Sequence, residues 1–346
     1  MIKEAISKVV ERRDLEPGEA ELVMDDIMSG RATSGQIASF LTALRMKGET
    51  VAEIVSFAHT MLRYASIITP QVAEVMIDTC GTGGDRIKTF NISTISAFVA
   101  AGAGVVVAKH GNRAVSSKAG SADVLEALGL NLMLEPDRVC ECIETVGIGF
   151  MFAPVFHPAM KYALGPRREI GIRTVFNILG PLANPAKVTA QVMGVYDVLL
   201  VEKIAKVLEG LGVSRALVAH GLDGLDEISP VGETTIAELR EGKIITYSVY
   251  PEDFGLGRAK VGEIEGGSAD ENARIAVDIL KGRRGARRNA VLMNAAAALV
   301  VGGLAADFKD GFELASLSVD SGEAYRKLED LIRFGGDESR LERFTR

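Results

Sequence analysis

The stretch Val75-Met-Ile-Asp-Thr-Cys-Gly-Thr-Gly-Gly-Asp85 decides the fold class of this chain. It begins with a β-rich run, Val75–Thr79, and passes directly into a glycine-rich loop. Asn91-Ile-Ser-Thr94 then supplies a capping side chain and opens a predicted helix over Ser93–Ala103. A strand, a glycine loop and a helix in this order predict the first unit of an α/β domain with a largely parallel sheet.

The same alternation continues downstream. The further predicted strands are Val105–Lys109, Leu130–Leu134, Ile148–Ala153, Thr189–Tyr196, Arg215–His220 and Ile245–Val249. The further predicted helices are Ser121–Leu128, Pro136–Val146, Val198–Leu211, Asn272–Leu280, Ala290–Leu304 and Gly322–Phe334. Right-handed crossovers would place the loops after the strands along one edge of the sheet, where ligands bind in folds of this kind.

The chain upstream of this stretch indicates helices only. Thr33 with Gln36 and Thr50 with Glu53 form two capping-box patterns, each followed by apolar residues at helical spacing. No strand is predicted before about residue 74, where the β-rich pattern starts. We therefore predict a small all-α domain over residues 1–70 and a large α/β domain over residues 71–346.

The composition narrows the class of protein. A hydrophobic fraction of 47% excludes an intrinsically disordered chain. A net charge of −7 argues against a surface that grips nucleic acid or an anionic membrane. The three cysteines form no CxxC pair, which favours a reducing cytosol. The N-terminus has no apolar signal core, and no apolar stretch reaches the ~20 residues of a membrane span.

Three loops carry residues suited to binding a phosphorylated molecule. Gly81-Thr-Gly-Gly-Asp85 lets backbone N–H groups approach a phosphate, although it is neither a Walker loop nor a dinucleotide fingerprint. The loop Lys109–Ser121 adds three cations, two adjacent serines and a helix cap. Asp226 and Glu227 are hard oxygen ligands suited to Mg²⁺ shared with substrate phosphates. The alternatives are a plain strand–turn–helix, a solvated basic loop and an acidic turn.

Residue chemistry alone therefore indicates an Mg²⁺-dependent enzyme acting on a small phosphorylated substrate. It leaves the second substrate and the transferred bond open. From residue chemistry alone, a lone histidine among apolar residues, such as His157, and an arginine such as Arg167 are more often structural than functional. The arginines at 283, 284, 287 and 288 lack the interleaved aromatic residues of a nucleic-acid patch and indicate a solvated helix end.

Together these motifs resemble the anthranilate phosphoribosyltransferase family, and the resemblance covers nearly the whole chain. The matching segments, in order, are Met28–Arg31, Phe40–Gly48, Gly81–Asp85, Thr89–Thr94, Lys109–Asn112, Gly120–Glu126, Gly171–Pro181 and Asn294–Ala296. Arg86 stands where a glycine is common in the family, and Ala119 where a serine is common. These departures affect details of the phosphate loops and not the reaction.

The resemblance implies a nucleoside phosphorylase/phosphoribosyltransferase-like architecture of two domains, with residues from about 165 to 185 folding back onto the helical domain. It implies a phosphoribosyl pyrophosphate site formed by Gly81, Thr82, Gly83, Gly84, Asp85, Thr89, Asn91, Ile92, Ser93, Thr94, Lys109, Ser117 and Ser121. It implies an anthranilate site formed by Gly81, His110, Asn112, His157 and Arg167. Ser93, Asp226 and Glu227 correspond to ligands of Mg²⁺, with two ions per subunit.

The implied reaction joins the anthranilate amine to C1 of the ribose and releases pyrophosphate, in tryptophan biosynthesis. No residue is expected to act as a general acid or base, because an aromatic amine is already neutral at pH 7. The resemblance also implies a cytoplasmic homodimer joined through the helical domains. The alternatives are a pyrimidine-nucleoside phosphorylase of the same fold, which would not need the Asp226–Glu227 pair, and a non-enzymatic nucleic-acid-binding relative.

Overall fold

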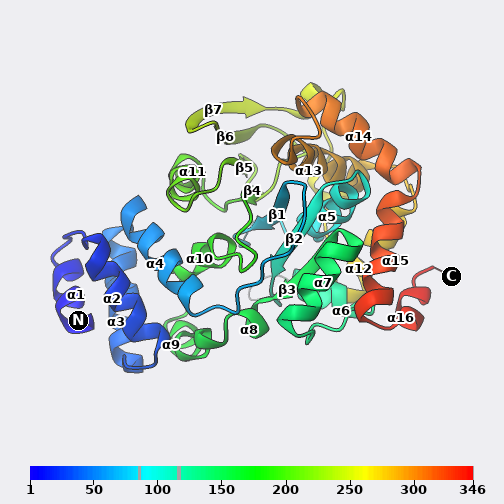
Figure 1. The fold of residues 1–346 in the computed structure, drawn as a ribbon. Helices are drawn as coiled ribbons and strands as arrows, with labels where there is room; N and C mark the ends of the chain where they lie inside the picture. The colour runs from blue at the N-terminus through cyan, green and yellow to red at the C-terminus, as the bar shows by residue number, and fades with distance from the viewer. Residues whose placement is uncertain (85–86, 115–117, 346) are drawn as a thin grey trace.

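The computed structural model describes residues 1–84, 87–114 and 118–345. A bundle of helices at the N-terminus lies beside a larger α/β part, as the blue and the cyan-to-red regions of Figure 1 show. The bundle contains α1 (Ile2–Val10), α2 (Pro17–Met28), α3 (Ser34–Lys47) and α4 (Val51–Arg63). In the described residues, no helix has the length and apolar character needed to cross a membrane.

Both predicted capping boxes form in this bundle. The hydroxyl of Thr33 accepts the N–H of Gln36 at 3.3 Å, and the Gln36 side chain accepts the Thr33 N–H at 2.9 Å. Thr50 and Glu53 make the same reciprocal pair at the start of α4. The fully buried Glu53 carboxylate also accepts Lys47 Nζ at 2.9 Å, so that α3 and α4 are tied together at one end.

The α/β part is built on one seven-stranded sheet in the order β3-β2-β1-β4-β5-β6-β7. The strands are β1 (Met76–Gly81), β2 (Val106–Gly111), β3 (Ile148–Phe152), β4 (Ala190–Gly194), β5 (Arg215–Gly221), β6 (Thr234–Arg240) and β7 (Lys243–Val249). Strands β1 to β5 pair in parallel, and β6 and β7 are added antiparallel at one edge. The predicted fold class, a largely parallel sheet flanked by helices with a small helical domain, is confirmed.

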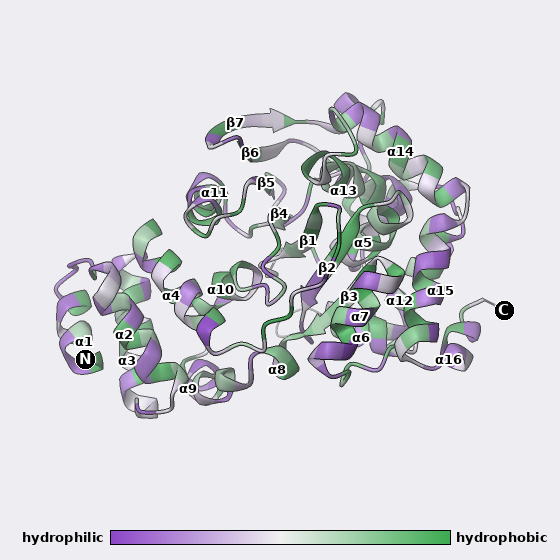
Figure 2. Cartoon of the chain, viewed as in Figure 1, coloured by the Kyte–Doolittle hydropathy of each residue, from purple (hydrophilic) through white to green (hydrophobic). Residues whose placement is uncertain are grey.

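Helices cover both faces of the sheet. The remaining helices are α5 (Ile92–Gly102), α6 (Ser121–Ala127), α7 (Pro136–Val146), α8 (Ala153–Phe156), α9 (Lys161–Ile170), α10 (Phe176–Leu182), α11 (Val201–Gly210), α12 (Ala269–Leu280), α13 (Ala286–Gly302), α14 (Phe308–Asp320), α15 (Glu323–Gly335) and α16 (Glu338–Glu342). One core joins the sheet to α5, α13 and α15, and a second joins the other face to α11 and the N-terminal bundle. In Figure 2 the strands β1, β2 and β3 and the helices α5 and α13 are largely green, which fits the burial of this part of the sheet on both faces.

Helices α9 and α10 are far from the bundle in sequence but pack on it. Helix α9 contacts α2 and α3, and α10 contacts α4. Because both helices lie between β3 and β4 in the chain, the polypeptide crosses between the two parts of the molecule more than once.

One predicted element needs correction, and several observed elements were not predicted. Leu130–Leu134 is not a strand: Leu130 makes one isolated bridge with Gly336, and the next residues form a turn before α7. Its apolar side chains instead pack into the helical core, which periodicity cannot distinguish over so short a run. The prediction also missed the strand β6 and the helices α8, α9, α10, α14 and α16. A tight turn with positive φ at Glu241 (52°) and Gly242 (70°) joins β6 to β7 as a hairpin.

Candidate active site

Three loops meet at one edge of the sheet. They follow β1, β2 and β5, and since these strands are parallel their carboxyl ends point the same way. The chain leaves β1 toward β2 on one side, whereas β4 and β5 lie on the other side. This reversal next to β1 is the place where ligands bind in open parallel sheets.

The Asp226–Glu227 pair reaches the glycine loop and the start of α5. Asp226 Oδ2 accepts the N–H of Gly83 at 2.7 Å, and Glu227 Oε1 accepts the N–H of Ser93 at 3.0 Å. Both carboxylate residues are buried, at 8% and 9% exposure. The acidic loop after β5 is therefore part of the same site as the loop after β1, and not a solvated turn.

Two glycines make this close approach possible. A Cβ added at Gly194, the last residue of β4, would lie 1.5 Å from the backbone oxygen of Asp226. A Cβ at Gly81 would lie 2.6 Å from Asp226 Oδ2. The backbone around Asp226 can lie against the ends of β1 and β4 only because these positions carry no side chain.

The donor set fits Mg²⁺ better than a softer metal. The described residues contain no group of three or more histidine, cysteine, aspartate or glutamate side chains arranged to hold an ion. Two adjacent carboxylates beside the Ser93 residue offer hard oxygen atoms but too few for a complete protein cage. Mg²⁺ is usually held in this way, by one or two carboxylates together with waters and substrate phosphates.

Neighbouring residues fix the conformation of the glycine loop after β1. Gly83 and Gly84 have φ of 67° and 82°, a backbone conformation that side chains disfavour. Arg173 Nη2 donates to the carbonyl oxygen of Gly84 at 2.7 Å, and its guanidinium lies 4.4 Å from the ring centroid of Tyr196. The Thr82 hydroxyl accepts the N–H of Tyr196 at 3.0 Å. The predicted contribution of Asp85 lies outside the described residues.

Asn91 joins the first loop to the second. Its Nδ2 donates to the carbonyl oxygen of Ala119 at 3.1 Å, and its Oδ1 accepts from Asn272 at 2.9 Å. Ile92 and Thr94 are buried in the first turn of α5, and Thr89 forms an isolated bridge with Glu265. Among the predicted phosphate residues, Asn91 thus uses its amide to fix the loops relative to one another.

Lys109 and Ser121 lie on either side of the second loop: Lys109 is in β2, and Ser121 is the first residue of α6. Lys109 is buried, and its ammonium donates to the carbonyl oxygen of Thr79 beneath the loops. Burial raises the pKa of the neighbouring Asp78 to about 6, although the charge of Lys109 acts in the opposite direction. The Ser121 hydroxyl donates to the carbonyl oxygen of Asn112 at 3.3 Å. Ser117 lies outside the described residues.

His110 and His157 form a buried pair near the same edge. Their ring centroids are 5.0 Å apart, His110 Nδ1 lies 3.2 Å from the carbonyl oxygen of Gly180, and His157 Nε2 lies 3.0 Å from that of Ala183. Burial lowers the pKa of His110 to about 3 and that of His157 to about 4. Both rings are therefore neutral at pH 7, and their second nitrogens have no hydrogen-bond partner in the described structure.

Arg167 lies apart from these contacts, near the end of α9. Its guanidinium carbon is 5.1 Å from the ring centroid of Phe176, and burial lowers the pKa of this arginine. Within the ranges that the structure describes, Arg167 forms no ion pair with a carboxylate. The Asn112 side chain caps the next residue by accepting the N–H of Arg113 at 2.8 Å, so no described contact yet links Arg167 and Asn112.

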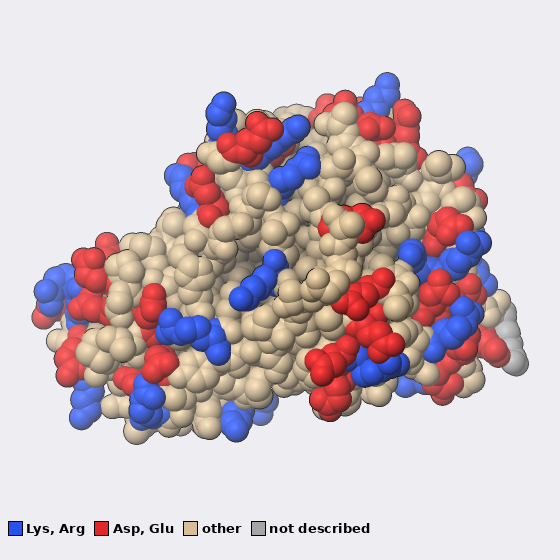
Figure 3. Space-filling view, in the orientation of Figure 1, with Lys and Arg blue, Asp and Glu red and all other residues tan. Residues whose placement is uncertain are grey.

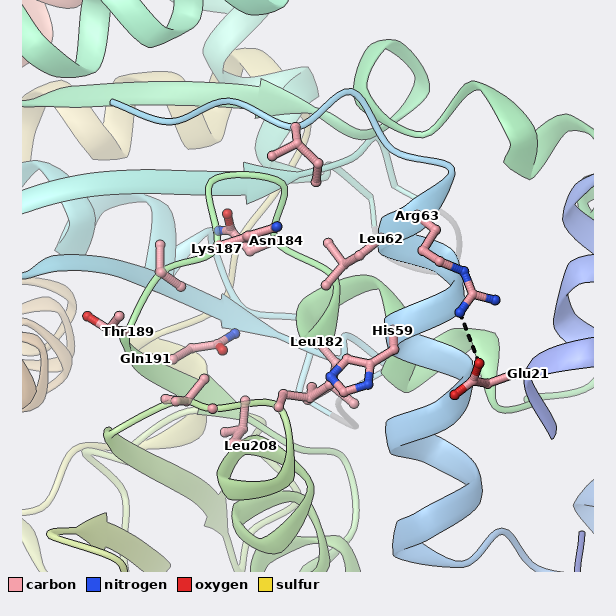
Figure 4. Close-up of a pocket in the computed structure, with 15 residues that line it drawn as sticks. Glu21, His59, Leu62, Arg63, Leu182, Asn184, Lys187, Thr189, Gln191 and Leu208 are labelled. Atoms are coloured by element: carbon pink, nitrogen blue, oxygen red, sulfur yellow. Dashed lines mark hydrogen bonds and ion pairs between the residues drawn. The ribbon is translucent and has the colours of Figure 1, made fainter. Parts of the chain in front are cut away.

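One cavity lies away from this site. It encloses about 620 Å³ between α4, the segment that leads into β4, and the end of α11. Figure 4 shows His59 of α4 pointing toward Leu182, whereas Arg63 on the same helix turns toward Glu21, with which it is paired. Its lining residue Thr189 directly precedes β4, and Val213 lies shortly before β5, so the cavity lies toward the amino ends of these strands. The three loops lie at the carboxyl ends.

Several residues that hold the loops were assigned no role from the sequence, although Asn294 and Arg173 lie in segments singled out above. Asn294 in α13 contacts the backbone beside Glu227, Asn272 in α12 orients Asn91, and Arg173 closes on Gly84. The available signal was an asparagine in an otherwise apolar helix, because a buried amide must find partners. Its target could not be read from the sequence.

Comparison with known proteins identifies relatives over the whole length. A model described as the helical bundle domain of a glycosyl transferase family matches residues 3–65, and one described as the a/b domain of that family matches residues 73–325. Anthranilate phosphoribosyltransferase of Acetivibrio thermocellus is 53% identical over 96% of each chain, and that of Pelotomaculum thermopropionicum is 56% identical over 97% of each chain.

Solved structures agree with the sequence relatives. The crystal structure of anthranilate phosphoribosyltransferase from Thermus thermophilus has a TM-score of 0.91 and 44% identity, and the match covers 95% of this chain and 98% of that one. The enzyme from Saccharomyces cerevisiae in complex with PRPP and Mg has a TM-score of 0.88 and 29% identity, over 96% and 97% of the two chains. The yeast enzyme has also been solved with 4-fluoroanthranilate.

Proposed function

Because the chain belongs to the anthranilate phosphoribosyltransferase family, we propose that it transfers the phosphoribosyl group of phosphoribosyl pyrophosphate to the amine of anthranilate. The products are N-(5-phosphoribosyl)anthranilate and pyrophosphate. The observation that carries this proposal in the structure is the convergence of Asp226 and Glu227 on the backbone of Gly83 and Ser93. A glycine loop and two hard anionic ligands meet there at the carboxyl edge of the sheet.

The reaction needs charge stabilisation more than proton transfer. The anthranilate amine is neutral at pH 7, while the departing pyrophosphate develops negative charge. Backbone N–H groups of the glycine loop and the start of α5, other than those of Gly83 and Ser93 that Asp226 and Glu227 already accept, can donate to phosphate oxygens. Mg²⁺, when bound by Asp226, Glu227 and Ser93, would supply further charge neutralisation for the pyrophosphate. The neutral His110 and His157 provide a polar but uncharged wall, which suits an aromatic amine.

The same proposal extends to the arrangement of the molecule. We place the helical unit at residues 1–70 with the 165–185 segment, and the phosphoribosyl pyrophosphate and metal sites in residues 71–346. Two Mg²⁺ ions per subunit, a homodimer and a cytoplasmic location complete it. The packing of α9 and α10 on the bundle supports the division. Basic and acidic side chains are interspersed in Figure 3 without a continuous basic patch on that face, which gives no support to nucleic-acid binding there.

A pyrimidine-nucleoside phosphorylase is the other activity that this architecture can host. It needs inorganic phosphate and not the Asp226–Glu227 metal pair. The relatives named above are anthranilate phosphoribosyltransferases, and the buried carboxylate pair favours the metal-dependent reaction. Loss of anthranilate fluorescence in the presence of phosphoribosyl pyrophosphate and Mg²⁺ tests the activity directly. No consumption at any Mg²⁺ concentration would contradict it.

The role of the carboxylates is tested by Asp226→Asn combined with Glu227→Gln. These changes keep the volume but remove two anionic ligands, so we expect kcat to fall and the Mg²⁺ concentration for half-maximal rate to rise about tenfold or more. The measurement is a Mg²⁺ titration of activity on both proteins. Thermal unfolding of both proteins is the control for folding. A folded double variant with normal kcat and normal Mg²⁺ dependence would show that Asp226 and Glu227 do not bind the metal.

A further inference from the structure

Asn294 is a buried polar residue in the middle of α13, and its side chain reaches the acidic loop. It is 3% exposed. Its Oδ1 accepts the N–H of Ile228 at 2.9 Å, and its Nδ2 donates to the carbonyl oxygen of Ile228 at 3.0 Å and to that of Ala290 at 2.9 Å. The amide therefore holds both backbone polar groups of the residue that directly follows Asp226 and Glu227.

The helix that carries this amide is part of the rigid core. Helix α13 packs against α5, β1, β4 and β5, and nearly all its central side chains are fully buried. Close-packed helices of this kind have little freedom to shift. The backbone of Ile228 both donates to and accepts from a side chain of this helix. The position of the acidic loop is therefore fixed by the core.

Loss of the Asn294 side-chain amide would affect the acidic loop first. Without Asn294, the N–H and C=O of Ile228 would be buried without partners, and each unsatisfied group is costly. The loop could satisfy them by moving toward water. That movement would draw Asp226 and Glu227 away from the N–H groups of Gly83 and Ser93, which they now accept at 2.7 and 3.0 Å.

We infer that Asn294 is a positioning residue that sets the geometry of the Asp226–Glu227 metal ligands by clamping the peptide groups of Ile228. This inference rests on the metal site of the proposed function. A residue that only stabilised the core would change the free energy of unfolding and leave metal affinity alone. A positioning residue changes both the affinity and the local order of the loop.

The test compares Asn294→Ala with Asn294→Ser and with a matched control. The serine hydroxyl, with space for a water, can replace part of the clamp and makes a folded variant easier to obtain. The control is Ser96→Ala, which removes another buried hydrogen bond to the same helix, from Ser96 Oγ to the carbonyl oxygen of Val291 at 3.0 Å, without touching the acidic loop.

Two measurements on these variants do not depend on enzymatic activity. The first is the dissociation constant of Mg²⁺ in the presence of phosphoribosyl pyrophosphate and the absence of anthranilate, measured by calorimetry. The second is amide hydrogen exchange of residues 221–231. For Asn294→Ala we expect the dissociation constant to rise about tenfold, and exchange in this segment to accelerate. Asn294→Ser should give a smaller change, and Ser96→Ala should lower the melting temperature alone.

Each outcome supports or overturns the positioning role of Asn294. Normal Mg²⁺ affinity and normal exchange of residues 221–231 in a folded Asn294 variant would make the residue structural only. Failure of both Asn294 variants to fold would also overturn the inference, because the core role would then dominate. If the wild-type protein bound no Mg²⁺, the metal part of the proposed function would fail, whereas faster exchange in the variants would still show that Asn294 holds the loop.

Discussion

Arg167 illustrates how one residue's surroundings suggest its role. The arginine is half-buried, stacks near Phe176 and has no carboxylate partner in the described ranges, so its charge is available to an anion. We predict that it binds the anthranilate carboxylate. Loss of a charge-assisted hydrogen bond costs about 1.5–3 kcal/mol, so Arg167→Ala should raise the KM for anthranilate about ten- to a hundredfold.

The adjacent Arg168 provides the control. It is exposed on the same helix, so Arg168→Ala should leave the KM for anthranilate unchanged. Steady-state kinetics with each substrate varied in turn separates the possibilities. A rise in the KM for phosphoribosyl pyrophosphate alone would assign Arg167 to the other substrate.

At the scale of elements, the sequence was most informative where a strand was followed by a distinctive loop. The glycine loop after β1 and the Asp226–Glu227 pair after β5 were both located from residue types, because ligand-binding loops need unusual chemistry. Leu130–Leu134 was wrongly predicted as a strand, because short apolar runs carry no reliable period, and β6 was not predicted. The contacts of Asn294 depend on packing between distant segments and could not be predicted.

The close approach of β4 to the acidic loop gives a prediction at this scale. Gly194→Ala places a Cβ where the backbone oxygen of Asp226 now lies, so the loop or the strand end must shift. We expect a loss of about 1–3 kcal/mol in the free energy of unfolding, the usual cost of overpacking. The Mg²⁺ concentration for half-maximal rate should rise as well, because the shift moves Asp226, a proposed metal ligand.

Gly232→Ala is the matched control, because Gly232 lies with Asp226 in the connection between β5 and β6. Nothing lies within 4 Å of the Cβ that it would add, and it should change stability by less than about 0.5 kcal/mol. Urea denaturation and a Mg²⁺ titration of both variants provide the comparison. If Gly194→Ala changed stability and Mg²⁺ dependence no more than Gly232→Ala, the end of β4 would accommodate a Cβ without a shift, which would contradict the prediction.

For the whole molecule, the proposed homodimer gives the broadest prediction. Met46 in α3 and Leu164 in α9 are 72% and 50% exposed, and both helices belong to the packed helical unit. Large apolar side chains left exposed on neighbouring helices are suited to an interface. If the subunits associate through this unit, the wild-type protein should sediment at twice the 36.8 kDa of one chain.

An aspartate at either position should weaken that association. Burying a leucine or methionine side chain contributes about 1.5–3 kcal/mol, so Met46→Asp or Leu164→Asp should raise the dimer dissociation constant at least about tenfold if the residue lies in the interface. Leu317→Asp is the control, because Leu317 is 63% exposed on α14 in the α/β part. Sedimentation equilibrium over a range of concentrations measures all three. Dissociation by Leu317→Asp alone would move the interface to the α/β part, and a monomeric wild type would exclude the dimer.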